Sequence, residues 1–160
     1  MSVRTLTRDD LQAWWQLRSE LWPDCSDIDN QRDTQVLLQD AHKNAVFLYH
    51  APDGTVRGFL EARLREYAED CETSPVGFIE GWYVVPEARG SGIGRSLVEA
   101  AERWAISKGC TEMASDAVID NIGSHAAHRA LGYEEVERIV CFRKPHGSIW
   151  CEIRAKPRSE

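Results

Sequence analysis

The sequence predicts a single mixed α/β domain. Its length of 160 residues is that of one domain with a full hydrophobic core. Its hydrophobic content of 42% and charged content of 28% are ordinary for a soluble globular protein. Segments with the two-residue period of strands alternate with segments that have the period of amphipathic helices. We expect the domain to cover residues 1–147, followed by a C-terminal tail at 148–160 in which Ile149–Ile153 has the pattern of an added strand.

The first half of the chain should form a strand, two helices and a β-hairpin. Thr7 followed by Asp10 is a helix-start signature, and apolar residues then recur at helical spacing until Pro23 ends the helix. Pro52-Asp53-Gly54 is a turn sequence between two strand-patterned runs. The other elements expected here are a strand at Arg4–Leu6, a polar turn at Ser26–Asn30, a helix at Gln31–Ala41, strands at Ala45–His50 and Val56–Tyr67, and an acidic loop at Ala68–Pro75.

The second half should add three strands and two helices. Val76–Val85 has the pattern of a strand with glycines at 77 and 81, and glycine inside a strand often marks a bulge. Arg95–Lys108 is amphipathic, and Gly109 is placed to end that helix. The remaining expected elements are a strand at Thr111–Val118, a helix from Asp120 or Asn121 to Leu131-Gly132, and a strand at Glu135–Arg143.

A glycine-rich turn, Arg89-Gly90-Ser91-Gly92-Ile93-Gly94, joins the strand ending at Val85 to the next helix. The free N–H groups and the dipole at a helix N-terminus attract anions, and glycines let a phosphate approach the backbone. A P-loop is excluded because Arg95-Ser96 replaces the required Lys-Ser/Thr pair. A dinucleotide fingerprint is excluded because the spacing is G-x-G-x-G. The turn therefore predicts a different phosphorylated cofactor.

The Arg-x-x-Gly-x-Gly pattern at 89–94, preceded by Val84-Val85-Pro86, resembles the acetyl-CoA-binding motif of the GCN5-related N-acetyltransferases. The resemblance implies a central, mostly antiparallel sheet flanked by helices. It also implies acetyl-CoA as acetyl donor, with no metal. The residues that it assigns to the cofactor are Trp82, Tyr83 and Val84 along the pantetheine arm, Arg89, Gly90, Ser91, Gly92, Ile93, Gly94 and Arg95 around the pyrophosphate, and Asn121. Asn121 is equally suited to be a helix N-cap.

Further segments resemble one subfamily, the aminoglycoside 6′-N-acetyltransferases. These segments are Leu21-Trp22-Pro23, Glu66-Tyr67, Thr73-Ser74-Pro75-Val76, Phe78-Ile79-Glu80-Gly81, Met113-Ala114-Ser115-Asp116 and the run from His128 to Arg138. This resemblance implies transfer of acetyl to the 6′-amine of aminoglycoside antibiotics by direct attack in a ternary complex, antibiotic resistance, and a homodimer.

The charge distribution agrees with a cationic small-molecule acceptor. The net charge is −7, of which residues 1–75 carry −6 (8 Lys/Arg against 14 Asp/Glu). A nucleic-acid surface would need a basic stripe instead, although solvated surface charge also explains the excess. Two loop-like stretches hold eight carboxylates beside two aromatic rings, namely Asp24, Asp27, Asp29 and Asp33 with Trp22, and Glu66, Glu69, Asp70 and Glu72 with Tyr67.

Two carboxylates are candidate catalytic groups that also contact the acceptor. Asp116 follows a predicted strand, and we expect it to hold the reacting ammonium and take its proton; its alternative role is a turn or capping residue. Glu80 lies inside an otherwise apolar strand, where it either positions the amine or faces solvent. At the position of the family's proton-donating tyrosine stands His128, which is either the acid or a passive helix residue.

The other predicted acceptor contacts are Trp22, Tyr67, Glu72 and Glu137. The two rings would stack on sugar faces or belong to the core. Glu137 would be surface charge without the resemblance, which places it at the acceptor across a dimer interface.

The chain gives no sign of disulfides, a zinc site or a membrane span. Its five cysteines include no C-x-x-C, and no apolar run approaches about 18 residues. With no signal-peptide core at the N-terminus, we expect a cytoplasmic protein that binds neither membrane nor nucleic acid. Two other functions remain open: acetylation of another amine, such as a polyamine or a peptide, and a non-catalytic acyl-CoA-binding regulator.

Overall fold

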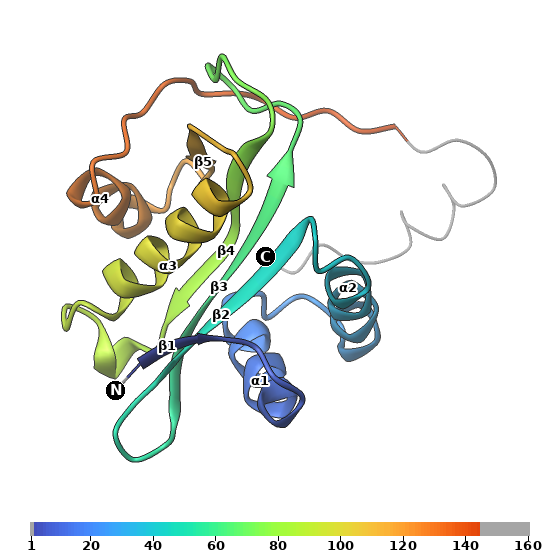
Figure 1. Ribbon diagram of the computed structural model, residues 1–160, viewed down its shortest axis with the longest axis vertical. Helices are drawn as coiled ribbons and strands as arrows, with labels where there is room; N and C mark the ends of the chain where they lie inside the picture. The colour runs from blue at the N-terminus through green and yellow to red at the C-terminus, as the bar shows by residue number, and fades with distance from the viewer. Residues whose placement is uncertain (1, 145–160) are drawn as a thin grey trace.

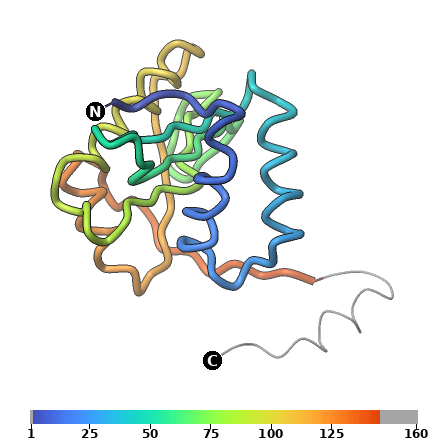
Figure 2. Tube along the Cα trace, turned by 90° about the horizontal axis from the view of Figure 1, so that it is seen from below, coloured from blue at the N-terminus to red at the C-terminus, as the bar shows by residue number. Residues whose placement is uncertain are grey.

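The computed structural model describes residues 2–144 and has a five-stranded sheet covered by helices on both faces (Figure 1). Helices α3 and α4 lie on one side of the sheet, and α1 and α2 lie on the other, as Figure 2 also shows for α1 and α2. The strands are β1 (Ser2–Thr5), β2 (Asn44–His50), β3 (Val56–Arg65), β4 (Val76–Val84) and β5 (Met113–Ser115). The helices are α1 (Leu11–Leu21), α2 (Asp27–Gln39), α3 (Ile93–Ser107) and α4 (Ile122–Ala130), with short 3-10 turns at Arg8–Asp10 (η1) and Pro86–Ala88 (η2).

The predicted mixed α/β class with a mostly antiparallel sheet is confirmed. The strands are ordered β1-β2-β3-β4-β5, and every neighbouring pair is antiparallel except β4 and β5, which are parallel. One core cluster packs Leu60 and Ile79 of the sheet against Leu97 of α3. A second packs Trp14 of α1 against Leu48 and other residues on the opposite face.

The first two helices begin at polar capping residues. The Thr7 backbone N–H and side-chain hydroxyl both donate to Asp10 Oδ2, at 2.9 and 2.6 Å, which confirms the predicted helix start. The predicted turn at Ser26–Asn30 is wrong, because α2 already begins at Asp27. Ser26 is its N-cap and accepts the Asp29 N–H at 3.1 Å. Acidic residues in a first helical turn complement the helix dipole, so this polar stretch suits a helix start.

The predicted bulge in β4 is present. Glu61 of β3 pairs with Gly81, but the next residue, Ala62, pairs with Ile79. Glu80 is therefore the extra residue of the bulge. Such a bulge bends the strand and redirects its side chains.

Two predicted strands differ from the structure. The strand expected at Thr111–Val118 is reduced to Met113–Ser115, because the chain leaves β4 after Ser115. The strand expected at Glu135–Arg143 is wrong: residues 134–144 form no regular element and pass from α4 across one end of the domain toward the side of α2 (Figure 1). No strand of the described chain pairs with them, so their alternating pattern has no hydrogen-bonding partner. The segment predicted at Ile149–Ile153 lies outside the described residues.

Across residues 2–144 no helix is both long and apolar enough to cross a membrane. The same residues contain no group of three or more histidine, cysteine or acidic side chains arranged to hold a metal ion.

Candidate active site

The site begins where β4 and β5 separate. Their parallel pairing covers only three residues and ends at Ile79 beside Ser115. Beyond that point, the edge of β4 from Glu80 to Val84 that faces away from β3 has no strand partner within residues 2–144. Exposed backbone groups along a strand edge are a template for an added extended chain. The predicted pantetheine contacts Trp82, Tyr83 and Val84, which the family resemblance implies, lie on this segment.

The glycine-rich turn lies between the end of this edge and the N-terminus of α3. Gly90 and Gly92 have φ angles of 78° and 85°, in the left-handed region where glycine is preferred. Gly92 is the N-cap of α3, so the first-turn N–H groups after it have no partner within the helix. A surface pocket of about 470 Å³ beside the turn is lined by Ser91, Gly92, Ile93, Arg95 and Arg103, among others. This geometry supports an anion site.

Gly94 leaves room for the indole ring of Trp82. A Cβ there would lie 2.9 Å from Cζ2 of Trp82. The role of Gly94 at the pyrophosphate stays a prediction. The two arginines of the motif brace the backbone: Arg89 Nε donates to the Val84 carbonyl at 2.9 Å, and Arg95 Nη2 donates to the Ala130 carbonyl at 3.2 Å.

Asn121 is the N-cap of α4. Its Oδ1 accepts the Ser124 N–H at 3.0 Å. The capping role is therefore confirmed, and it leaves the Nδ2 group of Asn121 for other contacts. It also removes the helix-capping alternative for Asp116, which is exposed directly after β5.

Glu80 is held by an arginine that the sequence analysis did not single out. Arg65 Nε and Nη2 donate to the two Glu80 carboxylate oxygens at 2.9 and 2.8 Å, and its guanidinium lies 3.5 Å from the centroid of the Phe78 ring. The hydrogen bonds to Glu80, joined by the charge of Asp116, raise the pKa of Arg65. Because both oxygens are engaged, the geometry favours a positioning role for Glu80 and leaves Asp116 as the freer carboxylate.

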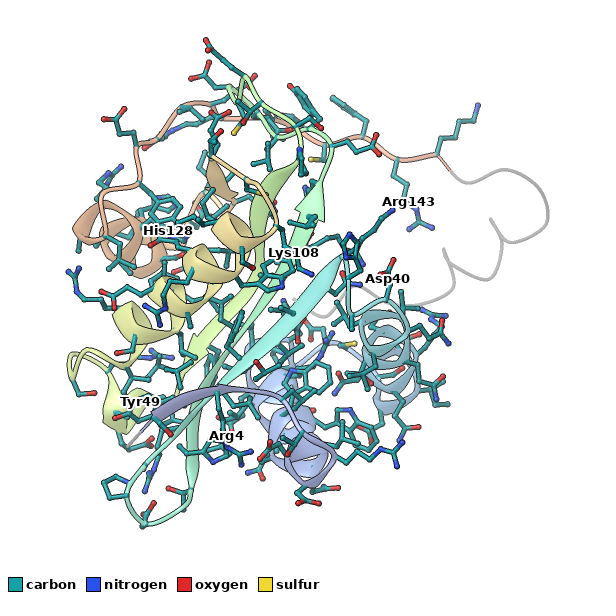
Figure 3. The ribbon with its side chains drawn as sticks, in the orientation of Figure 1. Arg4, Asp40, Tyr49, Lys108, His128 and Arg143 are labelled. Atoms are coloured by element: carbon teal, nitrogen blue, oxygen red, sulfur yellow. The ribbon has the colours of Figure 1, made fainter. Side chains whose placement is uncertain are left out.

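His128 is half-buried and lies on the sheet-facing side of α4 (Figure 3). Its Nε2 is 2.8 Å from Ser115 Oγ, and its Nδ1 is 2.7 Å from the Ser124 carbonyl oxygen. The ring also makes edge contacts with Trp82 and Tyr133, at centroid distances of 5.2 and 5.7 Å. His128 is thus tied to the last residue of β5, where the strands separate.

The aromatic candidates have different environments. Tyr67 is 67% exposed, which fits a stacking surface and excludes the core alternative. Trp22 is half-buried, with the Arg18 guanidinium 4.7 Å from its ring and Phe59 in edge contact at 6.2 Å. A Cβ at Gly81 would lie 2.6 Å from Cη2 of Trp22, so the glycine of β4 makes room for this ring.

The acidic loop that carries Glu72 is organised by Glu112. This carboxylate accepts the backbone N–H groups of Glu72 and Thr73, at 3.0 and 2.8 Å, and the Thr73 hydroxyl. These hydrogen bonds lower the pKa of Glu112, and the one from the Thr73 hydroxyl contributes most. Glu72 itself is exposed, and Glu137 is exposed on the extended segment after α4. The structure does not place Glu137 on a strand.

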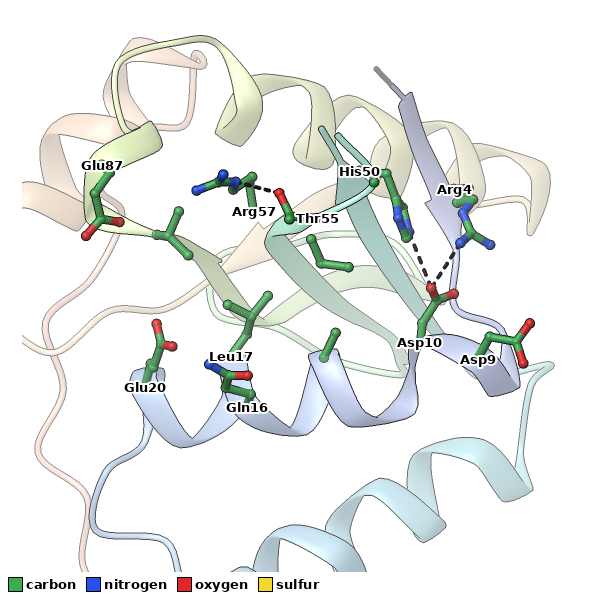
Figure 4. A pocket seen from close by; sticks show the side chains of 14 residues that line it. Arg4, Asp9, Asp10, Gln16, Leu17, Glu20, His50, Thr55, Arg57 and Glu87 are labelled. Carbon is green, nitrogen blue, oxygen red and sulfur yellow. Dashed lines mark hydrogen bonds and ion pairs between the residues drawn. The ribbon is translucent and has the colours of Figure 1, made fainter. Parts of the chain in front are cut away.

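Two further polar clusters contain none of the predicted catalytic residues. Glu61 is buried and accepts Trp14 Nε1 at 2.9 Å and Arg18 Nη1 at 2.8 Å; burial raises its pKa to about 7. At a second pocket, of about 570 Å³, Asp10 faces Arg4 at 3.0 Å and His50 at 3.5 Å (Figure 4). Burial acts to raise the pKa of Asp10, but hydrogen bonds from Thr7 and these charges lower it. This pocket contains none of the predicted site residues.

In this site a glycine-rich turn begins a helix, and it lies beside the edge of β4 that becomes free where β5 diverges from it. This is the architecture of an acetyl-CoA-dependent acyltransferase. Residues 11–133 match the model of the acetyltransferase (GNAT) family, and the chain belongs to this family.

The chain is similar to a narrower group within that family. It is 49% identical to an aminoglycoside N(6′)-acetyltransferase type 1 of Stenotrophomonas maltophilia, over 90% of this chain and 93% of the relative. It is 46% identical to the enzyme of the same name from Klebsiella aerogenes, over 89% and 95% of the two chains. Among solved structures, AAC(6′)-Iy in complex with the bisubstrate analogue CoA-S-monomethyl-acetylneamine superposes with a TM-score of 0.86, at 40% identity over 91% of this chain and 98% of that one.

Proposed function

We propose that the protein is an aminoglycoside 6′-N-acetyltransferase, which transfers acetyl from acetyl-CoA to the 6′-amine and thereby confers antibiotic resistance. The observation that carries this proposal is the free β4 edge at residues 80–84, which joins the glycine turn at one end and a group of carboxylates at the other. The relatives bearing this enzyme name cover nearly the whole chain.

The residues present suit acetyl-CoA. The backbone of Trp82, Tyr83 and Val84 would pair with the pantetheine amides, and the turn from Arg89 to Arg95 would hold the pyrophosphate. Trp82 Nε1 is buried without a hydrogen-bond partner in the described chain. Asn121 would contact the pantetheine arm through Nδ2. When bound, the coenzyme supplies the acetyl group as a thioester.

On the acceptor side, Trp22 and Tyr67 would lie against sugar rings, and the carboxylates Glu72, Glu80 and Asp116 would bind ammonium groups. Asp116 would take the first proton from the reacting ammonium. For an amine with the pKa of lysine, about 10.4, reaching the neutral form at pH 7 costs about 4.6 kcal/mol. Single exposed ion pairs contribute only about 0–1 kcal/mol. Affinity must therefore come from several pairs acting together.

We further propose a cytoplasmic homodimer that binds neither nucleic acid nor membrane. The extended segment supports the dimer, because Val136, Ile139, Val140 and Phe142 are exposed, with Phe142 at 92%. Apolar side chains on an unpaired extended segment favour pairing with another chain. Glu137 lies on the same segment, so it would reach an acceptor across the dimer interface.

The proposed reaction is tested by measuring free thiol released from acetyl-CoA with kanamycin, spermidine and a peptide amine in parallel. Turnover should be fastest with kanamycin and absent with paromomycin, which has a hydroxyl in place of the 6′-amine. Preference for spermidine or the peptide would assign another amine, and binding of acetyl-CoA without turnover of any amine would make the protein a regulator.

A further inference from the structure

A serine hydroxyl and a histidine meet at the point where β4 and β5 separate. Ser115 is the last residue of β5, directly before Asp116. Its Oγ lies 2.8 Å from His128 Nε2. We infer that Ser115 is a catalytic residue of the proposed acetyl transfer, and that it relays a proton between the acceptor amine, His128 and the leaving sulfur. This inference rests on the proposed function and adds a role for Ser115 to it.

The hydrogen bonds fix which nitrogen of His128 carries the proton. The Ser124 carbonyl oxygen, 2.7 Å from Nδ1, can only accept, so Nδ1 must be the protonated nitrogen. In the neutral ring Nε2 then holds a lone pair, and the Ser115 hydroxyl must donate to it. A Ser115 Oγ lone pair then remains available to accept an N–H. The Ser124 carbonyl thus orients His128, and His128 in turn accepts a hydrogen bond from the Ser115 hydroxyl. This arrangement of hydroxyl, base and orienting group is the one that activates a hydroxyl in catalysis.

The surrounding groups hold the ring in place without competing for its proton. Trp82 and Tyr133 lie nearly perpendicular to the imidazole, in edge contact with it. The Tyr133 hydroxyl donates to Glu102 Oε1 at 2.9 Å, and burial followed by the charge of Glu102 raises its pKa, so this tyrosine is a poor proton donor. The Ser124 hydroxyl lies farther from Nδ1, at 3.3 Å, and makes no contact with Nε2 in the described structure.

Two protons must leave an ammonium that becomes an amide, and two acceptors are present. Asp116 takes the first proton and later releases it to solvent, which frees the nitrogen lone pair to bond to the acetyl carbon. Ser115 Oγ accepts the second proton from that nitrogen as its own hydroxyl proton moves to His128 Nε2. The imidazolium is then hydrogen-bonded at both nitrogens. As the C–S bond breaks and its electron pair stays on sulfur, His128 returns the proton through Ser115 to that sulfur, giving amide and free thiol.

The experiment compares wild type with Ser115→Ala, Ser115→Thr and the matched control Ser107→Ala, which removes an exposed serine hydroxyl that donates to the Trp104 carbonyl at the end of α3. In Ser115→Ala we expect kcat with kanamycin to fall about 100-fold or more, the range of general acid–base catalysis. The KM for acetyl-CoA and the melting temperature should stay unchanged. Ser115→Thr should recover most of kcat, and Ser107→Ala should resemble wild type.

A second measurement reads the hydrogen bond without turnover. In the ligand-free protein, the ¹⁵N spectrum of His128 should show a protonated Nδ1 and a hydrogen-bonded Nε2, and Ser115→Ala should move the Nε2 resonance toward that of a free lone pair. Because the two residues act as a unit, His128→Asn combined with Ser115→Ala should lose no more kcat than the larger single effect.

Unchanged kcat in Ser115→Ala would overturn the relay, whether or not the Nε2 resonance moves, since the hydrogen bond would then be structural only. A protonated Nε2 in the neutral ring would overturn it as well. Failure of the wild-type protein to acetylate any amine while it binds acetyl-CoA would be a different result: it would refute the proposed function and the relay with it.

Discussion

Replacing Gly81 by alanine should weaken acceptor binding through Trp22. The new Cβ would lie 2.6 and 3.0 Å from two atoms of the Trp22 ring, whereas carbon atoms pack at about 3.5–4.0 Å. Phe59 and the Arg18 guanidinium already contact the Trp22 ring, so the ring cannot make room by rotating and the whole side chain must move. Overpacking of this kind costs about 1–3 kcal/mol.

If the displaced Trp22 loses a corresponding amount of binding energy for the acceptor, the KM for kanamycin should rise about 5- to 150-fold, because about 1.4 kcal/mol corresponds to a factor of ten. The KM for acetyl-CoA should change little. Gly54→Ala is the matched control: Gly54 has φ of 82° at a distant hairpin turn with open space around it, so alanine there strains the backbone without touching the site. An unchanged kanamycin KM in Gly81→Ala would show that Trp22 does not contact the acceptor.

Three other changes test separate parts of the account. Asp116→Asn should lower kcat far more than it alters the Kd of acetyl-CoA measured by calorimetry, up to a limit of about 4.6 kcal/mol set by the amine pKa; equal turnover would remove Asp116 from catalysis. Thr73→Val should raise the pKa of Glu112 toward its usual value in an NMR titration, because it deletes the main cause of the lowering. In wild type, ionised Glu112 stabilises the loop at pH values above the pKa that Glu112 has in the unfolded chain. This stabilisation is lost as pH falls through the lower pKa of Glu112 in the folded protein. Hydrogen-exchange protection of the Glu72 and Thr73 amides should therefore decline over that pH range. Arg18→Met should cost about 3–5 kcal/mol in urea unfolding by leaving Glu61 buried and unpaired, and Arg18→Met with Glu61→Met should recover much of it; a single variant as stable as wild type would contradict the pairing.

The local signals in the sequence predicted the framework well. The strand-turn-helix around Gly90 and Gly92 and the bulge beside Gly81 were found because glycine spacing reports backbone conformation directly. The end of β5 was predicted too late, because separation from β4 depends on a neighbouring strand and not on propensity. The segment after α4 has a strand pattern, but a strand forms only where a partner is present.

The contacts within the site were harder to predict. Arg65 lies 15 residues from Glu80, and Glu112 lies 39 residues from Thr73. The Ser115–His128 hydrogen bond joins a strand to a helix 13 residues later. The chemistry of Glu80 and His128 depends on these partners, which local sequence patterns do not reveal. The charge of Arg65 inside a predicted strand was the one available signal.

The central claim is that coenzyme A binds along the free edge of β4 and in the turn at 89–94. A crystal structure of the complex tests it most directly. The account predicts pantetheine amides hydrogen-bonded to the backbone of Trp82–Val84 and the pyrophosphate against the first-turn N–H groups of α3. Coenzyme seated in the pocket beside Asp10 and His50, or a β4 edge still vacant at saturating coenzyme, would contradict it.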